Sequence, residues 1–444
     1  MTRTFLKGKF VMTPEGLKEG YGVLTEGNMI KAVGPADKLE KELPEGTETI
    51  DFGDEMILPG FVNGHNHMYG FLSHGITAES MVTDFSNYLE DFWWPLVEDR
   101  VDHELCEITT KQACVEMADS GVTSFVDILE GPNSIPGALE VERKVVESAG
   151  LRGILSFEAC ERKSRENGEA GLSENIGFVK EHNLPGALVT GLMSIHTTFT
   201  CSKDFIKKAK DMCREAGCLM HMHLSESRFE PDHCLSRYGK TPVEVYDELG
   251  CLDENILASQ LVKVSDKEIE ILSKRGVKGI SMPLSNCEVG GGVAPVEKLL
   301  DAGVTVGLGT DGYVNNFFEV MRGAFLIHKG YQEAPQAMPA KTVYRMATEL
   351  GAKAIGVNAG SLEAGKLADI ITVGTDTPTP INENNVYDQI ILFRNPSNVG
   401  NVMVDGKWVK RNGELVTLDK ETVRAELSEK TQGFWNYRKQ EGSK

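Results

Sequence analysis

The sequence predicts an α/β protein, a (β/α)₈ TIM barrel joined to a small β-sandwich domain that is built from both chain ends. Two observations lead to this fold class. Between residues 58 and 360, short apolar segments alternate with longer segments of helical periodicity, whereas both flanking regions hold short strand-like segments separated by turn residues. Alternating strands and helices favour a parallel sheet, and eight such units fit a closed barrel better than an open sheet.

The composition limits the classes of protein and partner. Of the 444 residues, 41% are hydrophobic and 25% charged, which is typical of a folded globular protein. No apolar run approaches the roughly 20 residues that span a bilayer, and the N-terminus lacks the apolar core of a secretion signal. The formal charge of −20 argues against nucleic acid, because phosphates require a basic surface. We therefore expect neither a membrane nor a nucleic-acid partner.

The cysteines indicate the compartment. There are nine, an odd number, and no two of them form a Cys-x-x-Cys pair. We interpret them as reduced thiols of a cytoplasmic protein. A homodimer is expected only because twofold symmetry is common among soluble oligomers.

The elements are predicted in order along the chain. Residues 1–57 form a β meander with a hairpin turn at Gly27-Asn28. The eight barrel strands are expected at 61–67, 124–129, 152–157, 187–195, 218–223, 256–259, 277–281 and 304–309. Helices are expected at 104–120, 136–149, 204–216 and 266–275. The second helix would open at Pro136, because the first turn of a helix tolerates proline.

The last part of the chain is predicted to return to the β-sandwich. Strands are expected at 369–373, 389–393 and 402–409, with a hairpin turn at Asp405-Gly406, and a charged helix at 418–438. The predicted units are thus 1–57 (sandwich, first part), 58–360 (barrel), 361–417 (sandwich, second part) and 418–444 (C-terminal helix).

Polar side chains follow three of the predicted barrel strands. His65 and His67 end the first strand and share one face of it, His223 ends the fifth, and Asp311 follows the eighth. Catalytic groups of such barrels lie at the carboxyl ends of the strands, and this set of nitrogen and oxygen donors suits one divalent metal. Taken alone, Asp311 could equally cap a helix. His221, one pleat before His223, is expected in the core or behind a ligand.

Two further segments point to substrate chemistry. Glu226 lies three residues after His223, where a turn would bring its carboxyl over the metal to move protons between water and a substrate nitrogen. The alternative is a solvated loop glutamate. Trp93, in Phe92-Trp93-Trp94, could stack on a flat heterocycle, although core packing is an equal alternative.

These motifs carry a family resemblance. Residues 59–67, His223-Leu-Ser-Glu226 and the segment 307–312 resemble the metal-dependent amidohydrolase superfamily, in particular its cytosine deaminase-like and S-adenosylhomocysteine deaminase-like aminohydrolases. Within that branch, His67-Met-Tyr and the segments 92–94 and 377–380 are most similar to the SsnA-type aminohydrolases.

The resemblance implies an activity and a ligand set. It implies one divalent metal, Zn²⁺ or alternatively Fe²⁺, held by His65, His67, His223 and Asp311. A one-metal site is the better match because no lysine lies in 187–196. The implied reaction removes an amino group from a purine, pyrimidine, triazine or related ring through a metal-bound hydroxide. Asp311 would accept the proton of the water.

The remaining implied roles concern the substrate. Glu226 would protonate the ring nitrogen and the leaving ammonia, and His196 would lie beside the substrate. Gln260 departs from the family pattern, because active relatives carry a histidine there, and an amide cannot take up a proton. The segment Ser281-Met282-Pro283 likewise replaces the usual His-Asn-Pro. A non-catalytic metal- or ligand-binding protein and a cyclic amidohydrolase therefore remain as alternatives.

Overall fold

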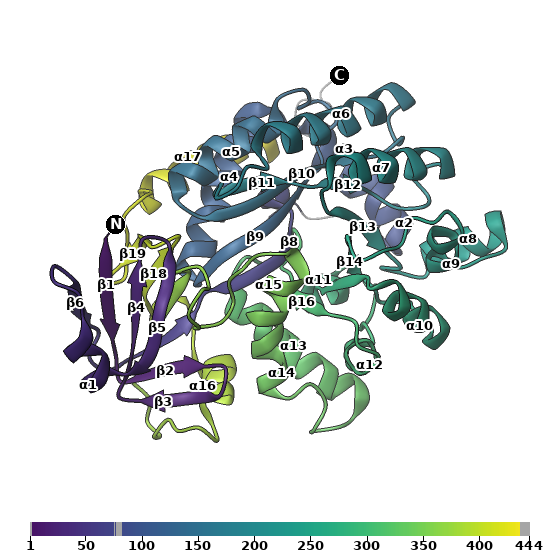
Figure 1. Cartoon of the computed structure of the whole chain (residues 1–444). Helices are drawn as coiled ribbons and strands as arrows, with labels where there is room; N and C mark the ends of the chain where they lie inside the picture. Colours follow the sequence, from purple (N-terminus) through teal and green to yellow (C-terminus); the bar gives the residue numbers. More distant parts are fainter. Residues whose placement is uncertain (1, 75, 77–81, 436–444) are drawn as a thin grey trace.

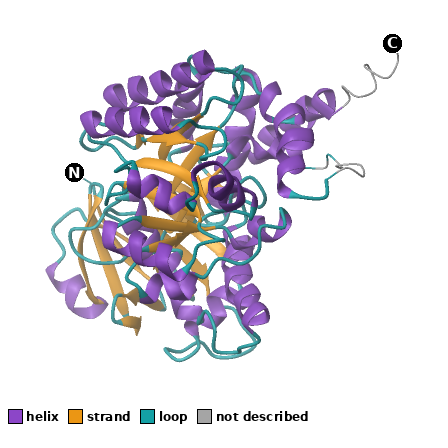
Figure 2. Ribbon diagram, turned by 90° about the vertical axis from the view of Figure 1, so that its right-hand side faces the viewer, coloured by secondary structure: helices purple, strands orange, loops and turns teal. Residues whose placement is uncertain are grey.

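A closed barrel of eight parallel strand positions forms the centre of the computed structural model, which describes residues 2–74, 76 and 82–435 (Figures 1 and 2). Its strands are β8 (Phe61–Asn66), β9 (Val122–Leu129), β10 (Arg152–Ala159), β11 (Val189–Gly191), β12 (Met193–Ile195), β13 (Met220–Leu224), β14 (Ile256–Gln260), β15 (Lys278–Ser281) and β16 (Val306–Leu308). Strands β11 and β12 flank Leu192 and occupy one position. The barrel closes because β8 pairs with both β16 and β9, and β9 pairs with β10. The predicted fold class is confirmed.

The helices surround the barrel (Figure 2). They are α4 (His103–Asp119), α5 (Ala138–Ala149), α6 (Arg165–His182), α7 (Lys203–Ala216), α8 (Phe229–Tyr238), α9 (Pro242–Glu248), α10 (Asp266–Arg275), α11 (Pro283–Glu288), α12 (Val296–Asp301), α13 (Phe317–Gln332), α14 (Ala340–Met346) and α15 (Glu349–Ile355). The predicted start of the second helix at Pro136 is wrong. The helix α5 begins at Ala138, because Gly137 before it has a left-handed φ of 100° that is incompatible with a helix.

The β-sandwich combines both chain ends (Figure 1). One sheet holds β1 (Arg3–Lys7), β4 (Tyr21–Glu26), β5 (Met29–Pro35) and β6 (Glu48–Asp51). The other holds β2 (Phe10–Thr13), β3 (Gly16–Glu19), β7 (Glu55–Pro59), β17 (Ile370–Gly374), β18 (Val399–Val404), β19 (Lys407–Arg411) and β20 (Glu414–Leu415). Strand β17 pairs with both β7 and β18, so the late strands extend a sheet that the N-terminal strands begin. Both predicted hairpin turns join antiparallel pairs.

One predicted strand is a helix. Residues 389–393 were expected to be extended, but they belong to α16 (Val386–Phe393). A short apolar run of this kind has no periodicity that separates a buried strand from a buried helix. Tertiary packing decides here, because Ile390 and Ile391 are fully buried beside α13 and α14.

The structural domain boundaries proposed from the sequence stay predictions.

The C-terminal helix α17 (Lys420–Trp435) packs on the barrel helices. The expected helix extended to residue 438, of which 436–438 lie outside the described residues. Val423 joins a small apolar cluster with Ile108 and Val115 of α4, and Trp435 donates its indole N–H to the Leu72 carbonyl at 2.8 Å. Among the described residues, no helix combines the length and apolar character needed to cross a membrane.

A buried ion pair joins the barrel to the sandwich. Arg152, at the start of β10, contacts Asp369 (Nε to Oδ2, 3.0 Å) and Asp405 (Nη2 to Oδ1, 3.0 Å). The backbone N–H of Asp405 also donates to Asp369 Oδ1 at 2.7 Å. One guanidinium therefore neutralises two carboxylates from the late part of the chain.

Candidate metal centre and pocket

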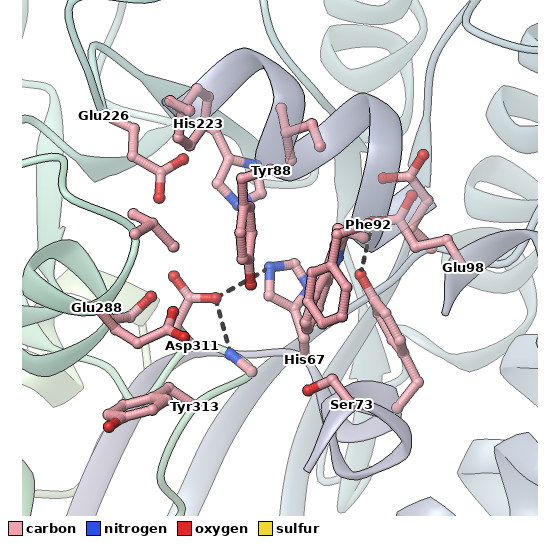
Figure 3. A pocket seen from close by; sticks show the side chains of 18 of the residues that line it. His67, Ser73, Tyr88, Phe92, Glu98, His223, Glu226, Glu288, Asp311 and Tyr313 are labelled. Carbon is pink, nitrogen blue, oxygen red and sulfur yellow. Dashed lines mark hydrogen bonds and ion pairs between the residues drawn. The ribbon is translucent and has the colours of Figure 1, made fainter. Parts of the chain in front are cut away.

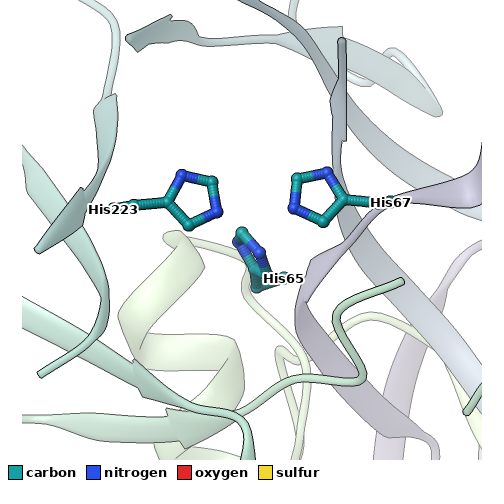
Figure 4. Close-up of side chains that lie close together, drawn as sticks. All are labelled: His65, His67 and His223. Atoms are coloured by element: carbon teal, nitrogen blue, oxygen red, sulfur yellow. The ribbon is translucent and has the colours of Figure 1, made fainter. Parts of the chain in front are cut away.

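Three histidines from two strands meet at the carboxyl end of the barrel. His65 is the penultimate residue of β8, His67 directly follows that strand, and His223 lies in β13. All three are buried, and one nitrogen from each lies within 4.8 Å of the others. Figure 4 shows the three rings turned toward a common space. The sequence placed these residues at strand ends, and barrel closure brings the ends of β8 and β13 to the same opening.

The ring of His65 is held from behind by His221. His65 Nδ1 lies 3.2 Å from His221 Nε2, and the opposite nitrogen of His221 lies 2.9 Å from Ser194 Oγ. His221 Nε2 is also 3.1 Å from Ser259 Oγ. His65 Nε2, in contrast, is buried without a hydrogen-bond partner among the described residues. A buried polar atom without a partner is costly, so this nitrogen fits a metal ligand.

The other two histidines are held in the same way. His67 Nδ1 lies 2.6 Å from the Ile128 carbonyl at the end of β9. His223 Nδ1 lies 3.1 Å from Glu158 Oε1 at the end of β10, a polar contact without the alignment of a hydrogen bond. Such partners fix the tautomer and orientation of ligating histidines. All three side chains are thus arranged to offer Nε2 to the common space.

The protonation of these rings suits metal binding. Burial is the first cause that lowers the pKa of His65, His67 and His223 below the ordinary value. The neighbouring rings add to this lowering at His65 and His67, whereas the negative charge of Asp311 opposes it at all three histidines. Neutral imidazole is the form that binds a metal. The donor set therefore fits a divalent cation of the zinc type.

Asp311 lies beside the histidines in a strained turn after β16. Its Oδ1 lies 3.6 Å from His67 Nε2 and accepts the Gly312 N–H at 2.7 Å. Burial alone would raise the pKa of this carboxyl, but His67 and the other histidines outweigh it and leave the pKa lowered. Asp311 does not cap a helix, since Asn316 caps α13, the next helix.

Backbone strain concentrates at the same end of the barrel. Ser225, Gln260 and Asp311 have φ values of 56°, 78° and 60°, a left-handed conformation that costs energy for residues other than glycine. Each follows or ends a barrel strand. Such strain clusters at sites where the chain must turn a side chain toward a ligand.

A cavity of about 240 Å³ opens over the histidines (Figure 3). Glu226 lines it and points toward the space beside Asp311. Burial raises the pKa of Glu226 well above the ordinary value, and the negative charge of Asp311 adds to this. A carboxyl that holds its proton in a dry pocket can act as a general acid.

The three predicted substrate-side residues also line the cavity. Trp93 stacks against Tyr88, with ring centroids 5.9 Å apart and an interplanar angle of 20°, in a π-helical segment, Tyr88–Trp93. His196 Nε2 lies 3.7 Å from Glu158 Oε1, and its Nδ1 is 2.8 Å from Thr200 Oγ1. Gln260 donates from Nε2 to Asp311 Oδ2 at 2.8 Å.

Several acidic residues of the cavity were missed. Glu130 directly follows β9 and Glu158 lies in the last residues of β10, so the search for polar side chains at strand ends would have found both. Glu98 and Tyr88 come from the segment between β8 and α4, which has no periodic signal. Glu288 ends α11 and approaches the cavity only because that helix packs at the barrel mouth.

Comparisons of the sequence with known proteins point to one protein family. The sequence model of the amidohydrolase family matches residues 56–409. The 5′-deoxyadenosine deaminase of Methanothermobacter thermautotrophicus is 34% identical over 430 residues, 96% of each chain. The 5-methylthioadenosine/S-adenosylhomocysteine deaminase of Thermococcus sibiricus is 34% identical over 411 residues, 91% of this chain and 93% of that one.

Solved structures share the fold at lower identity. An adenosine deaminase from Xanthomonas campestris with bound zinc superimposes with a TM-score of 0.87 at 22% identity, over 98% of each chain. The atrazine chlorohydrolase TrzN from Arthrobacter aurescens, complexed with zinc, gives a TM-score of 0.83 at 20% identity, over 97% of this chain and 100% of that chain.

Proposed function

Because the chain belongs to the amidohydrolase family, we propose that it is a metal-dependent aminohydrolase that removes an amino group from a purine, pyrimidine, triazine or related ring. Family membership confirms the superfamily expected from the sequence, and deaminases of adenosine derivatives are among its relatives. The narrower likeness to SsnA-type aminohydrolases stays a prediction. The observation that carries the proposal is the meeting of three neutral histidines and Asp311 beneath Glu226.

The proposed metal ligands are His65, His67, His223 and Asp311. The support is the common space between the rings, the unpartnered Nε2 of His65 and the proximity of Asp311 to His67. A divalent cation bound there would supply a nucleophile at neutral pH by lowering the pKa of a water. Zinc is the proposed metal, with iron as the alternative, because neutral imidazoles with one carboxylate suit both.

Two side chains of the cavity, Asp311 and Glu226, would accept and donate the protons of the reaction. Asp311, whose pKa is lowered, is ionised at neutral pH and can accept a proton at Oδ1 or Oδ2. Glu226, whose pKa is raised, can deliver a proton to a ring nitrogen and then to the departing ammonia. Trp93 and Tyr88 would hold the flat ring between the proton donor and the metal, and His196 would contact its edge.

The test measures metal content and ammonia release together. Protein purified without chelator should hold about one zinc or iron per chain, and His67→Ala should lose it, whereas His182→Ala, a histidine of α6 outside the cavity, should keep it. A screen of ring amines should detect ammonia release with the ring left intact. Glu226→Gln should retain the metal and lower kcat by about 100-fold or more. Unchanged turnover would remove Glu226 from the proposed mechanism.

Gln260 favours a second candidate, a metal-bearing protein that binds a ligand without turnover. The amide cannot exchange a proton as the usual histidine can. If wild type releases no ammonia from any ring amine and Gln260→His does not restore release, this candidate takes the place of the first. A cyclic amidohydrolase, the third candidate, is distinguished by its product, a new carboxylate in place of an intact ring.

The compartment and the partner are proposed from the cysteines and the net charge, and the oligomeric state from the frequency of twofold symmetry among soluble oligomers. All nine cysteines are free thiols, eight of them buried, which suits the reducing cytoplasm. A small heterocyclic molecule is the expected partner, and the net charge of −20 disfavours nucleic acid. We expect a homodimer, which light scattering would test.

A further inference from the structure

The cavity wall is acidic beyond what the proposed reaction uses. Six carboxyl side chains line it, namely Glu98, Glu130, Glu158, Glu226, Glu288 and Asp311. No lysine or arginine is among the described lining residues. Asp311 and Glu226 have roles in the proposed chemistry, and Glu158 contacts His223. Glu98 and Glu130 are left without such a role, although burying two carboxyls side by side is costly.

Glu98 and Glu130 share a single guanidinium. Arg162 Nη2 contacts Glu98 Oε2 at 3.0 Å and Glu130 Oε1 at 3.3 Å, while its Nη1 contacts Asp99 at 2.9 Å. The side chains of both glutamates are only 3% exposed. Three carboxylates thus share one guanidinium, and within the described part of the chain only Asp99 has a second basic partner, Lys163. Glu98 Oε1 also accepts a hydrogen bond from the Tyr69 hydroxyl at 3.2 Å. The carboxylate pair (Glu98 and Glu130) therefore needs another positive charge or a proton.

A second, independent polar group of the cavity lacks a hydrogen-bond partner. The side-chain oxygen of Gln260 is buried and has no hydrogen-bond donor among the described residues, while its Nε2 is committed to Asp311. Gln260 lines the cavity and is only 1% exposed. Buried acceptors of native proteins are almost always satisfied. This oxygen therefore points to a ligand that carries N–H or O–H donors.

The aromatic side of the cavity suits the same kind of ligand. Tyr88, Phe92 and Trp93 all line it, and Tyr88 lies over Trp93. Aromatic faces accept both a flat ring and a neighbouring cation. The cavity thus combines acceptors, negative charge and aromatic faces, and its described wall offers no lysine or arginine to pair with an anionic substituent.

On these grounds, and resting on the proposed function, we propose that the substrate is a heteroaromatic amine with a positively charged, non-reacting substituent. The substituent would be an ammonium or guanidinium group held against the carboxylate pair, Glu98 and Glu130. Substrates that carry a carboxylate or phosphate in that place are rejected.

The experiment compares three adenosine derivatives of similar size. 5′-Amino-5′-deoxyadenosine is cationic, 5′-deoxyadenosine is neutral, and adenosine 5′-carboxylic acid is anionic. With metal-loaded protein, kcat/KM for ammonia release should be about tenfold or more higher for the cation than for the neutral compound, and lowest for the anion. Glu130→Gln should remove most of the preference for the cation. Glu98→Gln serves if that variant does not fold, and Glu181→Gln, exposed on α6, should leave the preference unchanged.

The outcomes separate the substrate class from the reaction. Ammonia release at equal rates from all three compounds would overturn the charged substituent and leave the aminohydrolase intact. If none releases ammonia, calorimetry of benzamidinium and its neutral counterpart benzamide on the same protein decides the charge preference alone. Tighter binding of benzamidinium, weakened in Glu130→Gln, supports the proposal even where the reaction fails. Equal or weaker binding of benzamidinium overturns it.

Discussion

Gln260 Nε2 donates a hydrogen bond to Asp311 Oδ2 at 2.8 Å, so the amide at the end of β14 restrains the carboxylate that follows β16. Asp311 Oδ1 is left to face His67 and the Gly312 N–H. The residue that departs from the family pattern therefore contacts the proposed fourth metal ligand. In the free protein this hydrogen bond restrains the Asp311 carboxylate and is one of the contacts that lower its pKa.

Replacing Gln260 by glutamate tests this relationship. The Gln260→Glu substitution keeps the shape but sets a second carboxylate about where the amide donor was, so it should raise the pKa of Asp311 and lower kcat/KM by roughly 100-fold. Steady-state kinetics across a range of pH measure both effects, and metal analysis on the same preparation shows whether the cation is retained. The matched variant Glu288→Gln, also on the cavity wall, should change kcat/KM far less. Equal activity of Gln260→Glu and wild type would mean that the contact has no role in turnover.

Glu158 should act through His223. Its carboxylate holds His223 Nδ1, so Glu158→Gln should weaken metal binding about 10-fold to 100-fold, the usual effect of removing such a partner. Competition with a chromogenic chelator measures the metal Kd. The reduced kcat should return when metal is supplied in excess, as expected for a positioning residue. Failure of excess metal to restore kcat would instead assign Glu158 a direct role in turnover.

The buried carboxyls Asp127 and Glu142 should make stability depend on pH. Burial raises the pKa of Asp127 to about 7, and Glu142 beside it is raised well above its ordinary value. Between about pH 4 and pH 7 the folded state then binds more protons than the unfolded state. Stability should therefore fall as pH rises through this window, by up to roughly 4 kcal/mol for three pKa units.

Glu142→Gln supplies a neutral amide donor to Asp127 and should flatten this dependence. Urea unfolding of metal-free protein at several pH values measures it, since metal release at low pH would otherwise add its own effect. Glu147→Gln, exposed on α5, the helix that also carries Glu142, should keep the wild-type slope. A slope that survives in Glu142→Gln would assign the titration to other groups.

Arg152 should be essential to stability. Arg152→Ala leaves Asp369, whose side chain is 1% exposed, without its charge partner, and breaking a buried ion pair costs about 3–5 kcal/mol. Arg275→Ala, which breaks an exposed pair with Asp247, should cost less than about 1 kcal/mol. Thermal and urea unfolding compare the two. Similar losses would show that the junction between barrel and sandwich does not depend on Arg152.

Local patterns in the sequence were enough to predict the barrel, the two-ended sandwich and the strand-end positions of His65, His67, His223 and Asp311. Alternation of apolar strands and periodic helices is a local pattern, and parallel closure places all strand ends at one opening, so residues at those ends meet. The same rule applied to Glu130 and Glu158 would have extended the prediction to the acidic wall.

Other features of the fold and the cavity depend on long-range packing. Residues 389–393 became helical because packing beside α13 and α14 overrides a short apolar run that has no period of its own. Glu98 and Tyr88 line the cavity although they belong to an irregular segment. The amide of Gln260 donates to Asp311, which lies 51 positions later in the sequence. Contacts of this kind depend on distances between strands and on side-chain rotamers, which no local pattern of residues encodes.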